Sequence, residues 1–115
     1  MKTTLLALMT YCVLLQTADH RAWIDRNIQD GQMQIQGKFL NQRSEADTFR
    51  YELTTVKHGK AGRSQSSQGG QFVAPANEEI VLTQTTVSIQ AEDTYTIELK
   101  IFRSDSVYLQ DQIVH

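Results

Sequence analysis

The sequence predicts an all-β protein, a single antiparallel β-sandwich of about seven strands, on the basis of three observations. From Trp23 onward, apolar residues alternate with polar ones at a period of two. Turn signals such as Asp30-Gly31 interrupt this alternation at short intervals. No segment has a convincing helical period. Short alternating segments separated by turns are typical of a sandwich, in which each strand buries one of its faces.

Residues 1–18 are expected to form a secretory signal peptide. Lys2 precedes an apolar run from Leu5 to Leu15, which is too short to span a bilayer but has the length of a signal core. We expect cleavage after Ala18, and a retained membrane anchor is the alternative. The predicted organisation is a signal peptide at 1–18 followed by one sandwich domain at 19–115, which is enough chain for one modest core.

The first two strands are predicted at Trp23–Gln29 and Gln32–Phe39, joined as a hairpin. Asp30-Gly31 lies between them, and this dipeptide suits the two positive-φ positions of a tight turn. Gly37 falls on the apolar face of the second strand. A glycine there indicates a bulge or close packing against the facing sheet.

A third strand is predicted from Phe49. Phe49, Tyr51 and Leu53 point inward in its alternation, with polar residues between them. Val56 breaks this alternation by one residue, so we expect a bulge near Thr55.

The segment Gly59–Asn77 has almost no apolar side chain in its first half. We expect a turn at Gly59–Gly62, a polar strand over Arg63–Gln68 and a bend at Gly69-Gly70, with Pro75 ending the pairing. A loose loop is one alternative. A linker is another, but too little chain lies on either side for two cores. A strand this polar is expected at a sheet edge, where it discourages edge-to-edge aggregation.

Three more strands are predicted at Ile80–Ile89, Tyr95–Ile101 and Val107–Ile113. Turns at Ala91–Asp93 and Ser104-Asp105 separate them. Tyr95 follows a turn at the start of the penultimate strand, as does the tyrosine corner of immunoglobulin-like sandwiches. The predicted fold is therefore an immunoglobulin-like antiparallel β-sandwich, without the Cys–Trp–Cys pattern of antibody domains.

The composition argues against several function classes. The only cysteine, Cys12, lies in the predicted signal, so disulfides, thiol redox chemistry and thiolate metal sites are not expected in the domain. The formal net charge is −2, with no block of like charge, so no nucleic-acid partner is expected. The histidines His20, His58 and His115 have no second ligand at metal-binding spacing.

The acidic pairs Glu78-Glu79 and Glu92-Asp93 are adjacent along the chain. Neighbours in an extended chain point to opposite faces, so neither pair is expected to act as an acid–base dyad. We interpret them as solvated turn carboxylates. The protein is therefore predicted not to be an enzyme, and to have no metal and no cofactor.

The remaining candidate chemistry is a polar surface. Glutamine and threonine are frequent at outward positions, which indicates either an ordinary solvated face or a hydrogen-bonding surface for an extended chain. Four basic residues near the polar segment form a predicted cluster able to steer an acidic partner. The candidate partner-binding residues are Arg50, Lys57, Lys60, Arg63, Ser64, Gln65 and Gln68.

From Arg50 to about Leu109 the chain resembles the curli-assembly proteins of the CsgC/CsgH type, which are small immunoglobulin-like chaperones. The order and spacing of several short motifs carry the resemblance: Arg50, Gly59, Gly62-x-Ser64-Gln65-x-x-Gln68, Pro75-Ala76-Asn77, Ile80-x-Leu82-Thr83 and Asp93.

The resemblance implies a periplasmic, non-enzymatic factor that keeps the curli amyloid subunit from polymerising early. Contacts with the subunit would be transient and substoichiometric, made by a monomer that has no membrane attachment after signal cleavage. Some members carry a Cys-x-Cys pair where this chain has Asp47-Thr48-Phe49. A thiol-redox role is therefore not implied, and the cysteine-free CsgH type is the nearer match.

The alternative function is a generic exported binding module for an envelope protein or a carbohydrate. An enzyme on a similar sandwich, such as a copper–zinc dismutase, would need the clustered histidines that are missing here.

Overall fold

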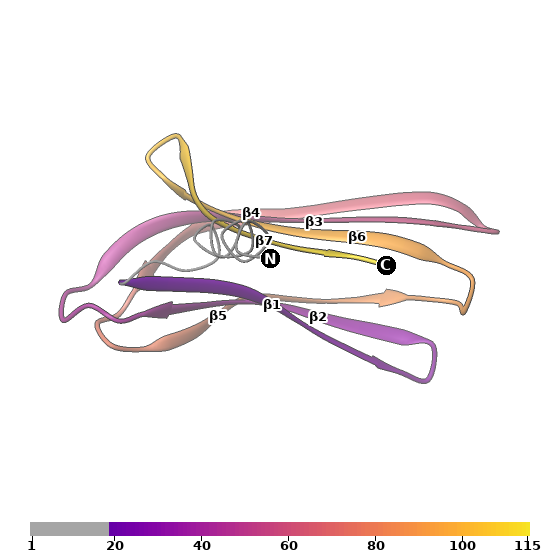
Figure 1. The fold of residues 1–115 in the computed structure, drawn as a ribbon, viewed down its shortest axis with the longest axis horizontal. Helices are drawn as coiled ribbons and strands as arrows, with labels where there is room; N and C mark the ends of the chain where they lie inside the picture. The colour runs from indigo at the N-terminus through magenta and orange to yellow at the C-terminus, as the bar shows by residue number, and fades with distance from the viewer. Residues whose placement is uncertain (1–18) are drawn as a thin grey trace, which may run out of the picture.

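Residues 19–115 are described by the computed structural model, and they form two antiparallel sheets stacked as layers (Figure 1). One sheet has the strand order β1-β2-β5 and the other β4-β3-β6-β7. The strands are β1 (His20–Gln29), β2 (Gln32–Asn41), β3 (Asp47–Gly59), β4 (Gly62–Ala74), β5 (Glu79–Ser88), β6 (Thr94–Arg103) and β7 (Ser106–Val114). The predicted all-β sandwich of seven strands is confirmed. The predicted signal peptide, 1–18, lies outside the described residues.

The core lies between the two sheets and is built from alternate residues of each strand. Strand β6 contributes four apolar side chains, because every second residue from Tyr95 to Ile101 is buried. The buried apolar residues are Ala22, Ile24, Met33, Ile35, Phe39, Phe49, Leu53, Ala74, Tyr95, Ile97, Leu99, Ile101 and Leu109.

Within residues 19–115, no helix has the length and apolar character needed to cross a membrane.

The β1–β2 hairpin turns at Asp30-Gly31, as predicted. Both residues have positive φ, 54° and 73°, which this dipeptide tolerates. Both interpretations of Gly37 are also confirmed. The pairing of β2 with β5 shifts register between Gly37 and Lys38, and a Cβ at Gly37 would lie 3.3 Å from Leu99 Cδ1 in the facing sheet.

The bulge predicted near Thr55 is wrong. Strand β3 pairs with β4 and with β6 without a register shift. Thr55 occupies the inward position and is buried, while Val56 lies on the outward side. The break in the sequence pattern therefore reflects a buried polar residue, not a change in the backbone.

The bend predicted at Gly69-Gly70 is also wrong. Strand β4 continues through both glycines, which pair with Glu52 and Tyr51 of β3. Glycine permits a bend but does not impose one, and here the ladder with β3 keeps the chain extended. Strand β4 does lie at the edge of its sheet, as predicted, and it ends one residue before Pro75.

Tyr95 differs from the tyrosine corner expected of it. Its side chain is buried, but its hydroxyl accepts a hydrogen bond from Arg26 Nη1 of β1. In an immunoglobulin tyrosine corner the hydroxyl bonds to backbone a few residues upstream. Here Tyr95 instead links the two sheets.

A second link between the sheets joins the first strand to the last. Asp111 in β7 accepts a hydrogen bond from the backbone N–H of Ile24 in β1, with Oδ2 at 2.9 Å from the nitrogen. Both strands are sheet edges, so this carboxylate satisfies a donor that would otherwise face outward. Asp111 is therefore an edge-closing residue.

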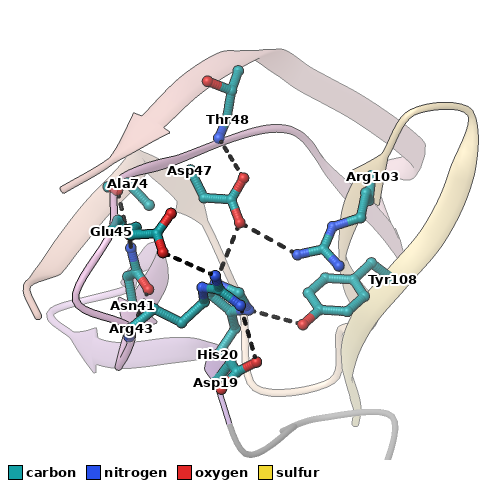
Figure 2. Close-up of polar contacts among 10 residues, drawn as sticks. All are labelled: Asp19, His20, Asn41, Arg43, Glu45, Asp47, Thr48, Ala74, Arg103 and Tyr108. Atoms are coloured by element: carbon teal, nitrogen blue, oxygen red, sulfur yellow. Dashed lines mark hydrogen bonds and ion pairs between the residues drawn. The ribbon is translucent and has the colours of Figure 1, made fainter. Parts of the chain in front are cut away.

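A polar cluster around His20 closes one end of the core (Figure 2). The imidazole is fully buried, and its ring centroid lies 5.1 Å from that of Phe49 and 5.5 Å from that of Phe39. Its Nδ1 hydrogen-bonds to the Tyr108 hydroxyl at 2.8 Å. Residues of β1, β2, β3 and β7 therefore meet around this one ring.

Charged groups surround the outer side of this cluster. Asp47 Oδ2 lies 3.8 Å from His20 Nε2 and 3.4 Å from Arg103 Nη2. The pKa of His20 is lowered from 6.5, first because the ring is desolvated by burial and then because the Arg103 guanidinium opposes a positive charge. The Asp47 carboxylate acts in the opposite direction but does not cancel these effects.

Asn41, which is fully buried, stabilises the connection between β2 and β3 by hydrogen bonds to its backbone. Its Nδ2 donates to the carbonyls of Glu45 (3.0 Å) and Ala74 (3.1 Å), and its Oδ1 accepts from Arg43 N–H (2.9 Å). One side chain thereby satisfies three backbone groups and ties the connection to the end of β4.

Replacing Asp111 by Ala is expected to lower the free energy of unfolding by about 1–2 kcal/mol, because the Ile24 N–H loses a charged acceptor. Urea denaturation measures this change. The control is Asp105→Ala in the exposed β6–β7 turn, which should change stability by less than about 0.5 kcal/mol. Equal effects of the two substitutions would contradict the edge-closing role of Asp111.

Stability is expected to fall as the pH drops below about 6.5, because His20 takes up a proton more readily in the unfolded chain than in the folded one. The unfolded state then binds more protons, so acid favours it. Urea midpoints near pH 7.5 and near pH 5.5 measure the slope. His20→Phe should flatten this slope, whereas His58→Phe, at an exposed position, should leave it unchanged. An unchanged slope in His20→Phe would contradict the assignment.

Candidate functional site

The alternation of β3 and β4 divides the predicted partner-binding residues between two faces. Successive side chains of a strand point to opposite sides of the sheet, and the buried positions of β3 identify the side that faces the core. Lys60 lies in the turn between the strands. Arg50, Arg63 and Gln65 lie on the outward side, and Lys57, Ser64 and Gln68 on the side of the core.

Lys57 is held inside the fold. Its Nζ donates to the Ser88 carbonyl at 2.8 Å and lies 3.8 Å from Asp93 Oδ2. Asp93 is 6% exposed and also accepts a hydrogen bond from the Gln90 N–H at 2.9 Å. A buried carboxylate needs such partners, so the ammonium group of Lys57 acts within the structure.

The prediction that Asp93 is a solvated turn carboxylate is therefore wrong, although the neighbouring Glu92 is exposed. Gly59 is part of the same arrangement, because a Cβ at this position would overlap Asp93 Oδ1. A carboxylate close to a glycine backbone leaves no local sequence pattern, since the two residues lie far apart in the chain.

Gln68 also makes an internal contact. Its Oε1 accepts a hydrogen bond from Thr83 Oγ1 in β5, across the open side of the sandwich between the two sheets. The side chain is half-buried. Gln68 thus connects the two edge strands β4 and β5.

Arg50 lies at the far end of the outward face. Its guanidinium sits 4.0 Å from the centroid of the Phe102 ring, a cation–π arrangement. Both residues line a shallow hollow of ≈ 270 Å³. Arg50 therefore belongs to the surface around Phe102.

Lys60 and Arg63 lie together at the β3–β4 turn, and both are exposed. Arg63 Nη2 donates to Gln65 Oε1 at 2.8 Å. Arg63 pairs across the ladder with His58, eight positions along β3 from Arg50. At about 3.3 Å per residue this separates Arg50 from the pair His58 and Arg63 by roughly 26 Å along the sheet. The structure thus does not bring the four predicted cations together.

The outer face of the three-stranded sheet carries the glutamines of β2. Gln36 Nε2 donates to Gln84 Oε1 at 3.2 Å, and Gln32 Nε2 to Ser88 Oγ at 3.4 Å. Lys38 on this face lies 2.7 Å from Asp25, and that hydrogen bond raises the pKa of the lysine. Two glutamines of β2, Gln32 and Gln36, therefore bond to side chains of the neighbouring strand β5.

The described residues offer little for metal or acid–base chemistry. Among residues 19–115 no group of three His, Cys, Asp or Glu side chains is placed to hold a metal ion. Buried ionisable groups such as His20 and Asp93 have structural partners. Of the predicted partner-binding residues, Lys60, Arg63, Ser64 and Gln65 are exposed, and they lie in β4 and its turn with β3.

The family model described as "Thin aggregative fimbriae synthesis protein" matches residues 14–113. Curated relatives include the curli assembly protein CsgC of Salmonella arizonae, 30% identical over 69 residues, which are 60% of this chain and 64% of the relative. CsgC of Escherichia coli K12 is 29% identical over 63 residues, 55% of this chain and 57% of the relative. The matched part is thus less than two thirds of the length of these relatives.

Two solved structures share the fold. The solution structure of R. palustris CsgH aligns with a TM-score of 0.64 at 19% identity, covering 83% of this chain and 91% of CsgH. A structure of the E. coli curli protein CsgC aligns with a TM-score of 0.67 at 22% identity, covering 81% of this chain and 96% of CsgC. The family match spans nearly all the described residues, and both structures have the same sandwich. The chain belongs to the family of thin aggregative fimbriae synthesis proteins, that of the curli assembly proteins CsgC and CsgH.

Proposed function

We propose that this protein is a periplasmic factor that delays amyloid polymerisation of the curli subunit during curli assembly. The observation that carries the proposal is the family match over residues 14–113. We further propose that it acts by binding and not by catalysis, with no cofactor, as a monomer exported by the segment 1–18.

The surface of β4 and its turn supports a binding role. From Ser64 to Gln71 the strand carries only glutamine, serine and glycine. Amyloid grows by adding extended segments whose backbones and amide side chains stack in register. A folded domain that presents similar chemistry can occupy the growing end of an early oligomer without offering the next template.

Contacts of this kind are weak, which suits a transient factor. The exposed strand offers hydrogen bonds that are worth only about 0.5–1.5 kcal/mol each in water, and little apolar area. Lys60 and Arg63 add positive charge at the β3–β4 turn, which accelerates encounter with an acidic partner more than it tightens the complex. The proposed partner is accordingly released, and one molecule acts on many subunits.

Mixing the purified protein with monomeric curli subunit at far below equimolar ratio should prolong the lag before amyloid fluorescence appears. The reason is that a factor acting on rare early oligomers need not match the subunit in number. A titration followed by thioflavin fluorescence measures the effect. An unchanged lag across the titration would contradict the proposed function.

Replacing Lys60 and Arg63 together by Gln should raise the protein concentration needed to double the lag by roughly two- to tenfold at low salt. The difference should shrink at high salt, where the steering field is screened. The matched control removes the same charge elsewhere, by Arg21→Gln with Arg43→Gln, both at exposed positions. Equal potency of the two variants would show that these cations only solvate the surface.

A further inference from the structure

The outer edge of β4 presents a regular row of backbone donors and acceptors. The β3–β4 hairpin has a two-residue turn, Lys60-Ala61, flanked by the pair Gly59 and Gly62. In such a turn the flanking residues bond to each other. Because hydrogen-bonded and non-bonded pairs alternate in an antiparallel ladder, every second residue from Arg63 to Val73 directs its N–H and C=O away from β3.

The other side of the sheet supports this register independently. Tyr95 and His115 exchange two backbone hydrogen bonds, of 3.1 and 2.9 Å. By alternation, Thr96 in β6 then bonds to Val56 in β3. The backbone N–H and C=O of Lys57, the next residue of β3, must therefore point toward β4. The outward-directed amides are those of Arg63, Gln65, Ser67, Gly69, Gln71 and Val73.

The edge of β4 lacks the features that usually protect a sheet edge. Such edges are blunted by charges, prolines, bulges or short length. Strand β4 has 13 residues, pairs without a register shift, and has neither charge nor proline between Ser64 and Gln71. It is the longest edge strand in the described part of the chain.

The other edge strands of residues 19–115 each carry such a feature. On β1, the Ile24 N–H is bonded to Asp111 of β7. On β5, the pairing with β2 shifts register at Gly37, and Glu79 begins the strand. The β6–β7 pairing shifts register beside Ile101. The contrast singles out β4 as the edge that is open to another strand.

Two glycines open the middle of this edge. A Cβ at Gly69 would lie 2.9 Å from the Tyr51 carbonyl oxygen, so the position excludes a side chain. Gly70 follows, and Gly69 is exposed. Adjacent glycines within a strand are suited to the close approach of another backbone.

We propose that the outer edge of β4, from Arg63 to Val73, binds an extended segment rich in Gln, Asn, Ser or Gly as an added strand. This inference rests on the proposed function, because the segment would belong to the amyloid subunit. Its backbone would pair with the outward amides, and its amide side chains would align with Gln65 and Gln71 at the spacing of a cross-β ladder.

Charge complementarity supports this occupant. An uncharged segment can pair with Ser64–Gln71 without bringing any charge out of water. A carboxylate beyond the end of the segment would lie beside Lys60 and Arg63. A second folded copy is a poorer occupant, because Val73 is the only large apolar side chain on the outward face of β4. Pairing two edges would bury little apolar area against the cost of association.

Hydrogen exchange read by NMR on the protein mixed with soluble early oligomers of the curli subunit tests the edge directly. At nine-tenths saturation, exchange at outward amides such as Ser67 and Gly69 should slow ~tenfold, because only the free tenth exchanges. The neighbouring amides of Ser66 and Gln68 already bond to β3 and should change little. An unchanged or uniform exchange pattern along β4 would overturn the inference.

A proline variant tests whether the outer edge of β4 is needed to extend the amyloid lag. Ser67→Pro removes one outward N–H and should abolish the lag extension. The matched control is Thr86→Pro, which removes an N–H that the register directs away from β2, at the edge of the other sheet. Thr54→Val controls for the lost contact between the hydroxyls of Thr54 and Ser67, 3.2 Å apart. Urea denaturation checks that each variant is folded.

The outcomes separate this inference from the proposed function. If the wild type prolongs the lag and folded Ser67→Pro does so equally, the edge inference fails and the proposed function stands. If the wild type has no effect on the lag, the proposed function fails. If the protein alone sediments as a dimer that Ser67→Pro dissociates, the edge is occupied by a second copy and the inference is overturned.

Discussion

The unbroken pairing of β3 with both of its neighbours is the constraint on which the rest of the structure depends. Because β3 has no register shift, every residue of β4 and β6 beside it has an assigned face and an assigned backbone direction. A single bulge near Thr55 would have turned Lys57 outward and away from Asp93. The position of each candidate residue therefore follows from the regularity of one central strand.

The contact of Lys57 with Asp93 shows how this regularity is used. A buried carboxylate in the β5–β6 connection needs a cation, and β3 supplies one from its inward side. Gly59 leaves room for the carboxylate. Two residues of the family motif, Gly59 and Asp93, thereby help Lys57 to hold this end of the sandwich together. The recognition surface proposed above is instead the polar backbone edge of β4 and its turn.

The fold could be predicted from the sequence because its determinants are local. Alternation, the Asp30-Gly31 turn and the polarity of Arg63–Gln68 each report a property of neighbouring residues, and the structure confirms them. The predicted bend at Gly69-Gly70 was wrong, because glycine composition is compatible with turn and strand alike.

The candidate site was less predictable, since its residues are positioned by contacts between distant segments. Arg50 and Arg63 are only 13 positions apart in the sequence. The β3–β4 ladder nevertheless places them at opposite ends of the sheet. The local sequence around Asp93 predicts a solvated turn residue, but in the fold its carboxylate lies against the backbone of Gly59 and is buried. The side of the sheet that a residue occupies, and how deeply it is buried, depend on strand register and on the facing sheet. A short stretch of sequence determines neither of these.

The hydrogen bond between Asp111 and Ile24 has a consequence for how the protein reaches its folded state. It joins residues 87 positions apart, and the bond between His20 and Tyr108 joins residues 88 positions apart. The first strand thus gains its last partners only when β7 is in place. With contacts of such long sequence separation, folding is expected to be slow for a domain of this size. A chain delivered from its N-terminus would expose the edge of β1 until almost all of it had arrived.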